Sequence, residues 1–97
     1  TRTTPEELIA AAHSACYSMA LSHALAGNGT PPAAIDTKAA VTFVPGQGIT
    51  GIALTVKASV PNLTPAQFAE FAENAKAGCP VSVALAGTQI TLDATLV

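Results

Sequence analysis

A long and almost uncharged helix at the start of the chain constrains the fold most. The run Thr4-Pro5-Glu6-Glu7 predicts its first turn, with Thr4 as the capping residue, Pro5 at the first helical position and Glu7 completing a capping box. The helix is predicted to end near Ala26, because two glycines follow. Its circumference is mostly apolar, Ala or Ser, and a helix of that kind is usually buried on most sides.

The rest of the chain alternates between strand and helix patterns. Period-two alternation predicts strands over about 35–44 and 49–60, joined as a hairpin by a turn at 45–48. A capping signature at Thr64 opens a second helix that Gly78 ends, and Pro80 begins a short third helix to about Ala86. Alternation returns over 88–97. We expect one domain, 1–97, of α+β class, in which an antiparallel sheet packs on the long buried helix.

Charge limits the possible partners. Only 10% of the 97 residues are charged, against roughly 25% in an ordinary domain, which suggests that some surface is covered by another chain. Four basic side chains and a net charge of −2 provide no basic stripe, so nucleic acid is not an expected partner. The apolar run 8–26 contains His and Ser and lacks basic flanks, so we expect no membrane association and a cytoplasmic protein.

Two cysteines are too few for a disulfide scaffold, and in a reducing compartment such a pair more often has redox chemistry. Cys79 precedes Pro80 at a predicted helix start, where free N–H groups and the helix dipole lower a thiol pKa. Cys16 lies about three turns into its helix and needs a cationic neighbour from elsewhere. His13, three residues earlier on the same face, is one candidate.

Each of these residues also has a plainer interpretation. Cys16 in an Ala-rich helix can be inert packing, and His13 can be a hydrogen-bonded core or interface residue. A metal site at His13, Cys16 and His23 lacks a fourth ligand of firm spacing, so we expect no metal and no cofactor. Glu6 and Glu7 are first of all partners of the helix dipole.

Three segments together resemble the OsmC/Ohr family of hydroperoxide-reducing proteins, and its OsmC branch in particular. They are Thr4-Pro5-Glu6-Glu7 with the following Ala-His-Ser-Ala-Cys stretch, then Gly78-Cys79-Pro80-Val81-Ser82, and the closing Ile90-Thr91-Leu92-Asp93. The resemblance implies a peroxidase in which Cys16 is the peroxidatic cysteine and becomes a sulfenic acid. It implies that Cys79 is the resolving cysteine, and that an external dithiol, lipoyl-protein or thioredoxin-like, reduces the Cys16–Cys79 disulfide.

The resemblance also assigns Glu6 to the family glutamate that holds a catalytic arginine over the peroxidatic sulfur. In the family that arginine precedes the Thr-Pro-Glu-Glu motif by several residues, within an N-terminal β-region. We expect this chain to be N-terminally short relative to the family, and Arg2 lies too close to the helix to take the arginine's position.

Helix geometry separates Glu6 from Cys16. Ten residues of one straight helix place them about 15 Å apart along the axis, too far for one active site. We therefore predict an intertwined homodimer with composite sites, in which the glutamate of one copy serves the cysteine of the other.

Two matters stay open at this level. Organic hydroperoxides and hydrogen peroxide are both plausible substrates, and Met19, Phe68 and Phe71 are either core residues or the lining of a substrate entrance. The alternative function is a catalytically impaired OsmC-like dimer that binds a ligand or senses redox state. Both cysteines favour the enzyme, and the expected lack of the arginine segment favours the alternative.

Overall fold

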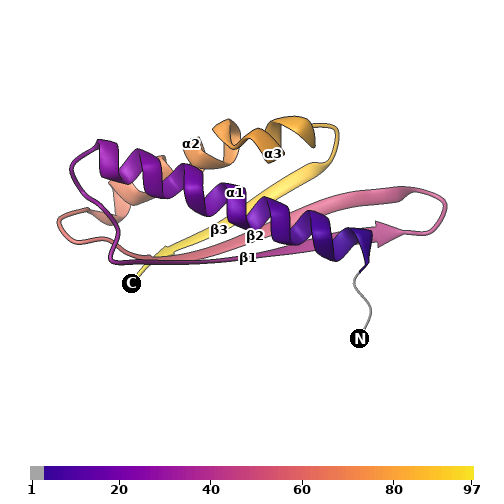
Figure 1. The fold of residues 1–97 in the computed structure, drawn as a ribbon, viewed down its shortest axis with the longest axis horizontal. Helices are drawn as coiled ribbons and strands as arrows, with labels where there is room; N and C mark the ends of the chain where they lie inside the picture. The colour runs from indigo at the N-terminus through magenta and orange to yellow at the C-terminus, as the bar shows by residue number, and fades with distance from the viewer. Residues whose placement is uncertain (1–3) are drawn as a thin grey trace.

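The computed structural model describes residues 4–97. It contains helix α1 (Pro5–Gly27), strands β1 (Ala34–Val44) and β2 (Gly48–Ser59), helices α2 (Pro65–Gly78) and α3 (Pro80–Ala84), and strand β3 (Gln89–Leu96). This order confirms the predicted α+β class, and most boundaries lie within a residue or two of those expected (Figure 1). The helices begin at the predicted residues, and of the capping box expected at Thr4 the structure shows the bond from the Glu7 N–H. Thr4 accepts a hydrogen bond from the Glu7 N–H at 3.2 Å, and Thr64 forms a full capping box with Gln67.

The sheet has the order β1-β2-β3 and is mixed. Strands β1 and β2 form the predicted antiparallel hairpin, whose turn places Gly46 and Gly48 at positive φ, the region that glycine adopts without strain. The expectation of a wholly antiparallel sheet is wrong, because β3 pairs with β2 in parallel. Helices α2 and α3 form a crossover between these two strands and return the chain to the end at which β2 began.

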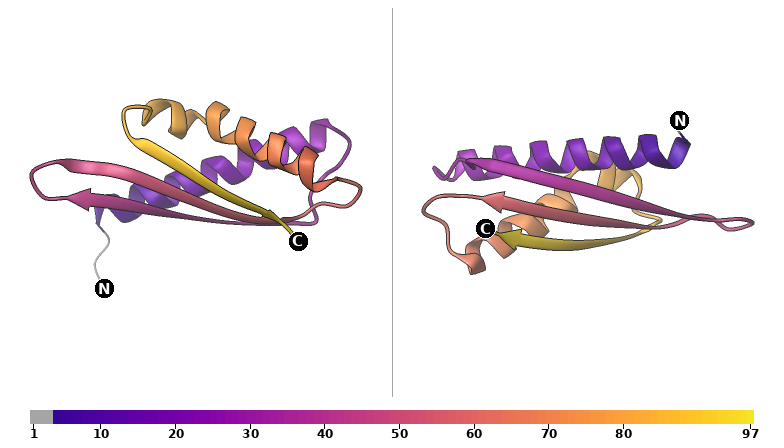
Figure 2. Two further views of the ribbon diagram at one scale, coloured as in Figure 1. Left: turned by 180° about the vertical axis from the view of Figure 1, so that it is seen from behind. Right: turned by 90° about the horizontal axis from the view of Figure 1, so that it is seen from below.

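All three helices cover one face of the sheet, which gives a two-layer molecule of 46 × 29 × 18 Å (Figure 2). Alternate β2 residues, Ile52, Leu54, Val56 and Ala58, face the helices and are buried, whereas Lys57 and Thr55 between them are exposed. The long helix α1 packs mainly on β1 and along α2. One sheet face is therefore uncovered in the single chain.

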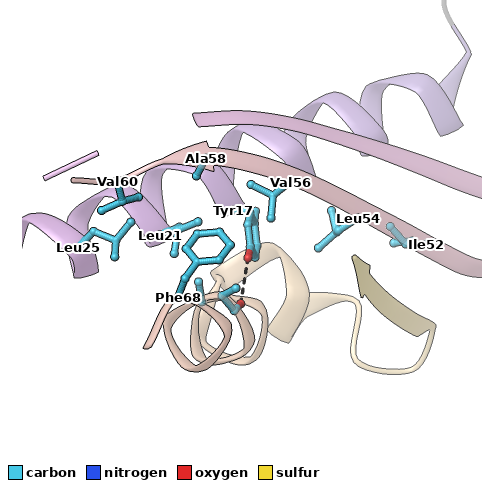
Figure 3. Packing of buried hydrophobic residues seen from close by; sticks show 11 residues of the cluster. Tyr17, Leu21, Leu25, Ile52, Leu54, Val56, Ala58, Val60 and Phe68 are labelled. Atoms are coloured by element: carbon cyan, nitrogen blue, oxygen red, sulfur yellow. Dashed lines mark hydrogen bonds between the residues drawn. The ribbon is translucent and has the colours of Figure 1, made fainter. Parts of the chain in front are cut away.

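Side chains from α1, β2 and α2 form the core between the layers (Figure 3). On α1 only one stripe is buried, at every fourth residue: His13, Tyr17, Leu21 and Leu25. The prediction that this helix is buried on most sides is not met within one chain, because a single layer covers only one side of it. Leu8 and Met19 on the same helix are 61% and 72% exposed.

Candidate thiol site

Cys79 occupies the junction between α2 and α3. It is the last capping residue of α2 and the first of α3, with its N–H donating to Ala75 O at 2.9 Å and its C=O accepting from the Val83 N–H at 3.0 Å. Its extended ψ of 125° is the conformation that a residue before proline favours, and Pro80 follows. The side chain is completely buried. Local sequence therefore fixes both the position and the orientation of this thiol.

Polar groups around Cys79 favour its thiolate. Burial by itself raises its pKa, but interactions with the Cys16 thiol, with the N–H and hydroxyl of Ser82 and with the Val81 N–H outweigh burial. The pKa of Cys79 is therefore lowered, as the helix-start position predicted. No side-chain hydrogen bond of full capping geometry forms at this residue, so these contacts are looser than an oxygen cap.

Cys16 lies beside Cys79, although α1 and α3 are far apart in the sequence. Both thiols are free, and Cys16 is the partly exposed member of the pair. Burial raises the pKa of Cys16, as do its interactions with Cys79, and the Val81 N–H opposes them only in part. Within residues 4–97 the surroundings thus favour the thiolate form of the buried sulfur over that of the sulfur that solvent reaches.

His13 is buried and hydrogen-bonded, which confirms its plainer interpretation. Its Nε2 lies 2.7 Å from the Ser82 Oγ, and neither side chain is appreciably exposed. Burial lowers the pKa of His13. The hypothesis that this residue is the cationic neighbour of Cys16 is therefore not supported, because burial disfavours the charged form of its imidazole.

Ser82 is the site residue that the sequence analysis quoted without assigning a role. It occupies the third position after the capping Cys79, and a side chain at that position lies back over the cap. Val81 contributes through its backbone N–H, which no side-chain pattern reveals. The Cys-Pro-X-Ser spacing was therefore a sequence signal for Ser82, and there was none for Val81.

Glu6 is not brought to the thiols. Helix α1 continues without a break from Pro5 to Gly27, so the glutamate in its first turn is about 15 Å from Cys16 along the axis. Its side chain is half-buried. Arg2 lies outside the described residues. Within one chain the site consists of Cys16, Cys79, Ser82 and His13.

The remaining candidates lie elsewhere. Phe68 is buried in the core and Phe71 packs against it, whereas exposed Met19 lines an open groove of about 610 Å³ between α1 and the start of β1, together with His23. In residues 4–97 no three His, Cys, Asp or Glu side chains gather as metal ligands. Within the same range, no helix is both long and apolar enough to cross a membrane.

Comparisons with known proteins agree with this architecture. The solved OsmC-like protein of Mycoplasma pneumoniae superposes with a TM-score of 0.88 at 18% identity, covering 100% of this chain and 74% of that one. The organic hydroperoxide resistance protein OhrB of Bacillus subtilis superposes with a TM-score of 0.67 at 25% identity, covering 100% of this chain and 72% of that one. The α+β fold is therefore that of OsmC and Ohr proteins.

Sequence similarity narrows the relationship. Peroxiredoxin OsmC of Escherichia coli is 49% identical over 94 residues, which cover 94% of this chain and 65% of that protein. The chain thus spans just under two thirds of the length of the curated relatives it matches. The family model described as OsmC-like protein matches residues 1–94. This chain belongs to the OsmC-like protein family.

Proposed function

We propose that this protein is a thiol peroxidase that reduces organic hydroperoxides, and also hydrogen peroxide, through a two-cysteine cycle. The observation that carries the proposal is the pairing of a partly exposed thiol, Cys16, with a buried neighbour, Cys79, that is stabilised as a thiolate. The names of relatives, among them a peroxiredoxin and a hydroperoxide resistance protein, agree with it.

In the first step the Cys16 sulfur, as its thiolate, attacks an oxygen of the hydroperoxide. A sulfur–oxygen bond forms as the O–O bond breaks, and the leaving alkoxide takes a proton to become an alcohol. Cys16 is then a sulfenic acid. Its partial exposure makes it the sulfur that a hydroperoxide can reach, whereas Cys79 is closed to solvent.

In the second step Cys79 attacks the sulfur of that sulfenic acid. A disulfide forms, the S–O bond breaks, and hydroxide leaves and is protonated to water. An external dithiol, lipoyl-protein or thioredoxin-like, then restores both thiols by exchange. The raised pKa of Cys16 means that the first step needs a further positive group near this sulfur. In our proposal that group is an arginine, and Glu6 of a second copy of the chain holds it over Cys16, as the family resemblance implies.

The test is turnover of cumene hydroperoxide and of hydrogen peroxide with dihydrolipoamide or reduced thioredoxin as the electron donor. We expect sustained alcohol formation from the full chain, none from Cys16→Ser, and a single turnover from Cys79→Ser. Ser22→Ala, an exchange at a half-buried serine of α1 that lines the groove beside Met19, is the matched control and should turn over normally. Peroxide consumption no faster than that by free cysteine would refute the proposal.

The predicted homodimer has its own test. Sedimentation at micromolar concentration should give twice the chain mass, and mixing Glu6→Gln chains with Cys16→Ser chains should recover part of the activity that each lacks alone. A monomer with full peroxidase activity would contradict the composite site.

A thiol-based redox sensor is the second candidate, and the raised pKa of Cys16 favours it. A sensor needs only slow formation of a sulfenic acid or disulfide. Stoichiometric oxidation of Cys16 without turnover, in the presence of either donor, would select this function over the peroxidase.

A further inference from the structure

The buried hydrogen bond between His13 and Ser82 has no role in the two steps above. Ser82 has a single hydroxyl hydrogen, so it donates either to His13 or to Cys79 but not to both. Which way it donates depends on the position of the hydrogen on the His13 ring.

The surroundings of the second ring nitrogen of His13, Nδ1, indicate which nitrogen carries the hydrogen. Nδ1 is buried and has no hydrogen-bond partner among the described residues. Nδ1 is unpaired in either tautomer, and an orphaned buried N–H is rarer in folded proteins than an under-satisfied acceptor, which disfavours a hydrogen on Nδ1 in a neutral or a doubly protonated ring. The hydrogen of the neutral ring is therefore on Nε2, which donates to the Ser82 Oγ at 2.7 Å. The Ser82 hydroxyl hydrogen is then free to point at the cap residue, Cys79.

We propose that His13 and Ser82 are positioning residues that form a donor chain, from His13 Nε2–H to the Ser82 Oγ and from the Ser82 O–H to the Cys79 Sγ, and so prepare Cys79 for disulfide formation. The inference rests on the proposed peroxidase function. The three side chains are buried together where α1 crosses the start of α3. A lowered pKa of Cys79 agrees with a hydroxyl donor at its sulfur.

The donor chain acts on the second step of the peroxidase cycle, in which the disulfide forms. Once Cys16 is a sulfenic acid its sulfur no longer carries a thiol hydrogen, and the Ser82 hydroxyl is the side-chain donor at Cys79 that the first step leaves unchanged. The thiolate of Cys79 then attacks the Cys16 sulfur, the S–O bond breaks, and the leaving hydroxide becomes water by taking up from solvent the proton that Cys79 released on ionising. The donor chain does not assist the first step, the attack of Cys16 on the peroxide, because a negative Cys79 raises the pKa of Cys16.

The titratable groups that face the donor chain are few. Cys16 and Tyr17 lie on α1 beside His13, Cys79 lies at the α2–α3 junction, and Glu73 of α2 acts electrostatically on Tyr17. Burial is the cause that lowers the pKa of His13. A pH profile of disulfide formation therefore reports on Cys79 with little interference from charged neighbours.

The experiment follows the decay of the Cys16 sulfenic acid after rapid mixing of reduced protein with cumene hydroperoxide, by trapping with dimedone and intact mass. Losing one hydrogen bond to a charged sulfur removes roughly ten- to a hundredfold of thiolate at neutral pH. The less acidic thiol is a better nucleophile, with a Brønsted slope near 0.4–0.5, so we expect Ser82→Ala to slow disulfide formation only about three- to tenfold.

The pH profile separates this role from a structural one. With Ser82→Ala the midpoint of disulfide formation should move to higher pH, and above both midpoints the variant should be at least as fast as the unmodified chain, because its thiolate is the better nucleophile. Ser82→Thr should restore the midpoint, and Ser14→Ala, which removes a hydroxyl bonded to Ala11 O, should leave it unchanged. A variant that is slower by the same factor at every pH would overturn the proposal.

Two readouts do not depend on peroxide. In a Cys16→Ser background Cys79 is the remaining cysteine, and Ser82→Ala should raise the pH at which its thiolate absorbance appears. Nitrogen NMR of His13 should show the hydrogen on Nε2. A hydrogen on Nδ1, or an unchanged thiolate midpoint, overturns the donor chain even if the protein is a peroxidase. If the unmodified chain consumes no peroxide while both readouts behave as expected, the proposed function fails and the donor chain stands.

Discussion

Replacing Phe68 by alanine should remove a large part of the protein's free energy of unfolding. The same change at Phe43 is the matched control. Phe68 is 2% exposed at the start of α2 and lies in the cluster with Tyr17 and Leu21 (Figure 3), whereas Phe43 at the hairpin is 52% exposed. A buried aromatic side chain removes about 150–250 Å² from water, worth about 4–6 kcal/mol at 25 cal/mol per Å². Measured Phe→Ala costs in cores are about 3–5 kcal/mol.

We therefore expect Phe68→Ala to lower the free energy of unfolding by about 3–5 kcal/mol, out of the roughly 5–15 kcal/mol typical of a domain. Even the lower value corresponds to a fall in Tm of about 12–24 °C for a chain of this size. Urea denaturation followed by circular dichroism measures the first quantity and calorimetry the second. Phe43→Ala should change stability by less than about 1 kcal/mol.

The thiol site depends on the same packing. Phe68 holds α2 against α1, and α2 carries Cys79 at its far end, so a loosened α2 separates Cys79 from Cys16. Phe68→Ala should slow disulfide formation even below its lowered Tm. Equal losses of stability from the two Phe variants would refute this account of the core, as would a loss below about 1 kcal/mol at Phe68.

Three smaller perturbations test individual contacts. Burial raises the pKa of Tyr17, the sole tyrosine, whose hydroxyl donates to Ala72 O at 2.9 Å. The tyrosine of the unfolded chain therefore ionises first, so the stability that is present below about pH 10 should fall as the pH rises above it. Tyr17→Phe should remove that fall. Phenolate absorbance that appears at the ordinary pH of tyrosine in the folded protein would contradict the burial. Thr37→Val removes the acceptor of the Ser18 hydroxyl, 2.7 Å away between α1 and β1, and should cost about 0.5–1.5 kcal/mol in urea denaturation; no change would show that this pair does not join the two elements. Thr64→Ala deletes the capping box of α2 and should cost about 0.5–2 kcal/mol, with Thr64→Ser retaining most of it.

Local signals in the sequence predicted most of the elements. Caps, glycines and period-two alternation are encoded within a few residues, so the helices and the hairpin were placed closely. The direction of β3 was not predictable in this way, because it depends on the crossover through α2 and α3 rather than on the strand's own pattern. Burial around α1 was overestimated for a related reason, since a helix sequence does not state how many layers surround it.

The thiol site was predicted unevenly. Pro80 made the helix-start position of Cys79 visible, and the Cys16 thiol lowers the pKa of Cys79 together with the N–H groups of Ser82 and Val81 at that helix start. The pairing with Cys16 came from the family resemblance, because no spacing rule joins α1 to α3. For His13 the sequence indicated the correct helix face but not the charge, which burial decides. The contact of Ser82 with Cys79 is local and can be read from the Cys-Pro-X-Ser spacing, whereas its contact with His13 joins distant elements and leaves no periodic trace.

The most direct measurement adds one equivalent of cumene hydroperoxide to the reduced protein and follows the intact mass, with peptide mapping of the product. Our account predicts rapid loss of two hydrogens as a Cys16–Cys79 disulfide forms. Cys79→Ser should stop as the Cys16 sulfenic acid, and Cys16→Ser should not react. If neither thiol reacts faster than free cysteine, or if Cys79 oxidises while Cys16 stays reduced, the two-cysteine mechanism is contradicted.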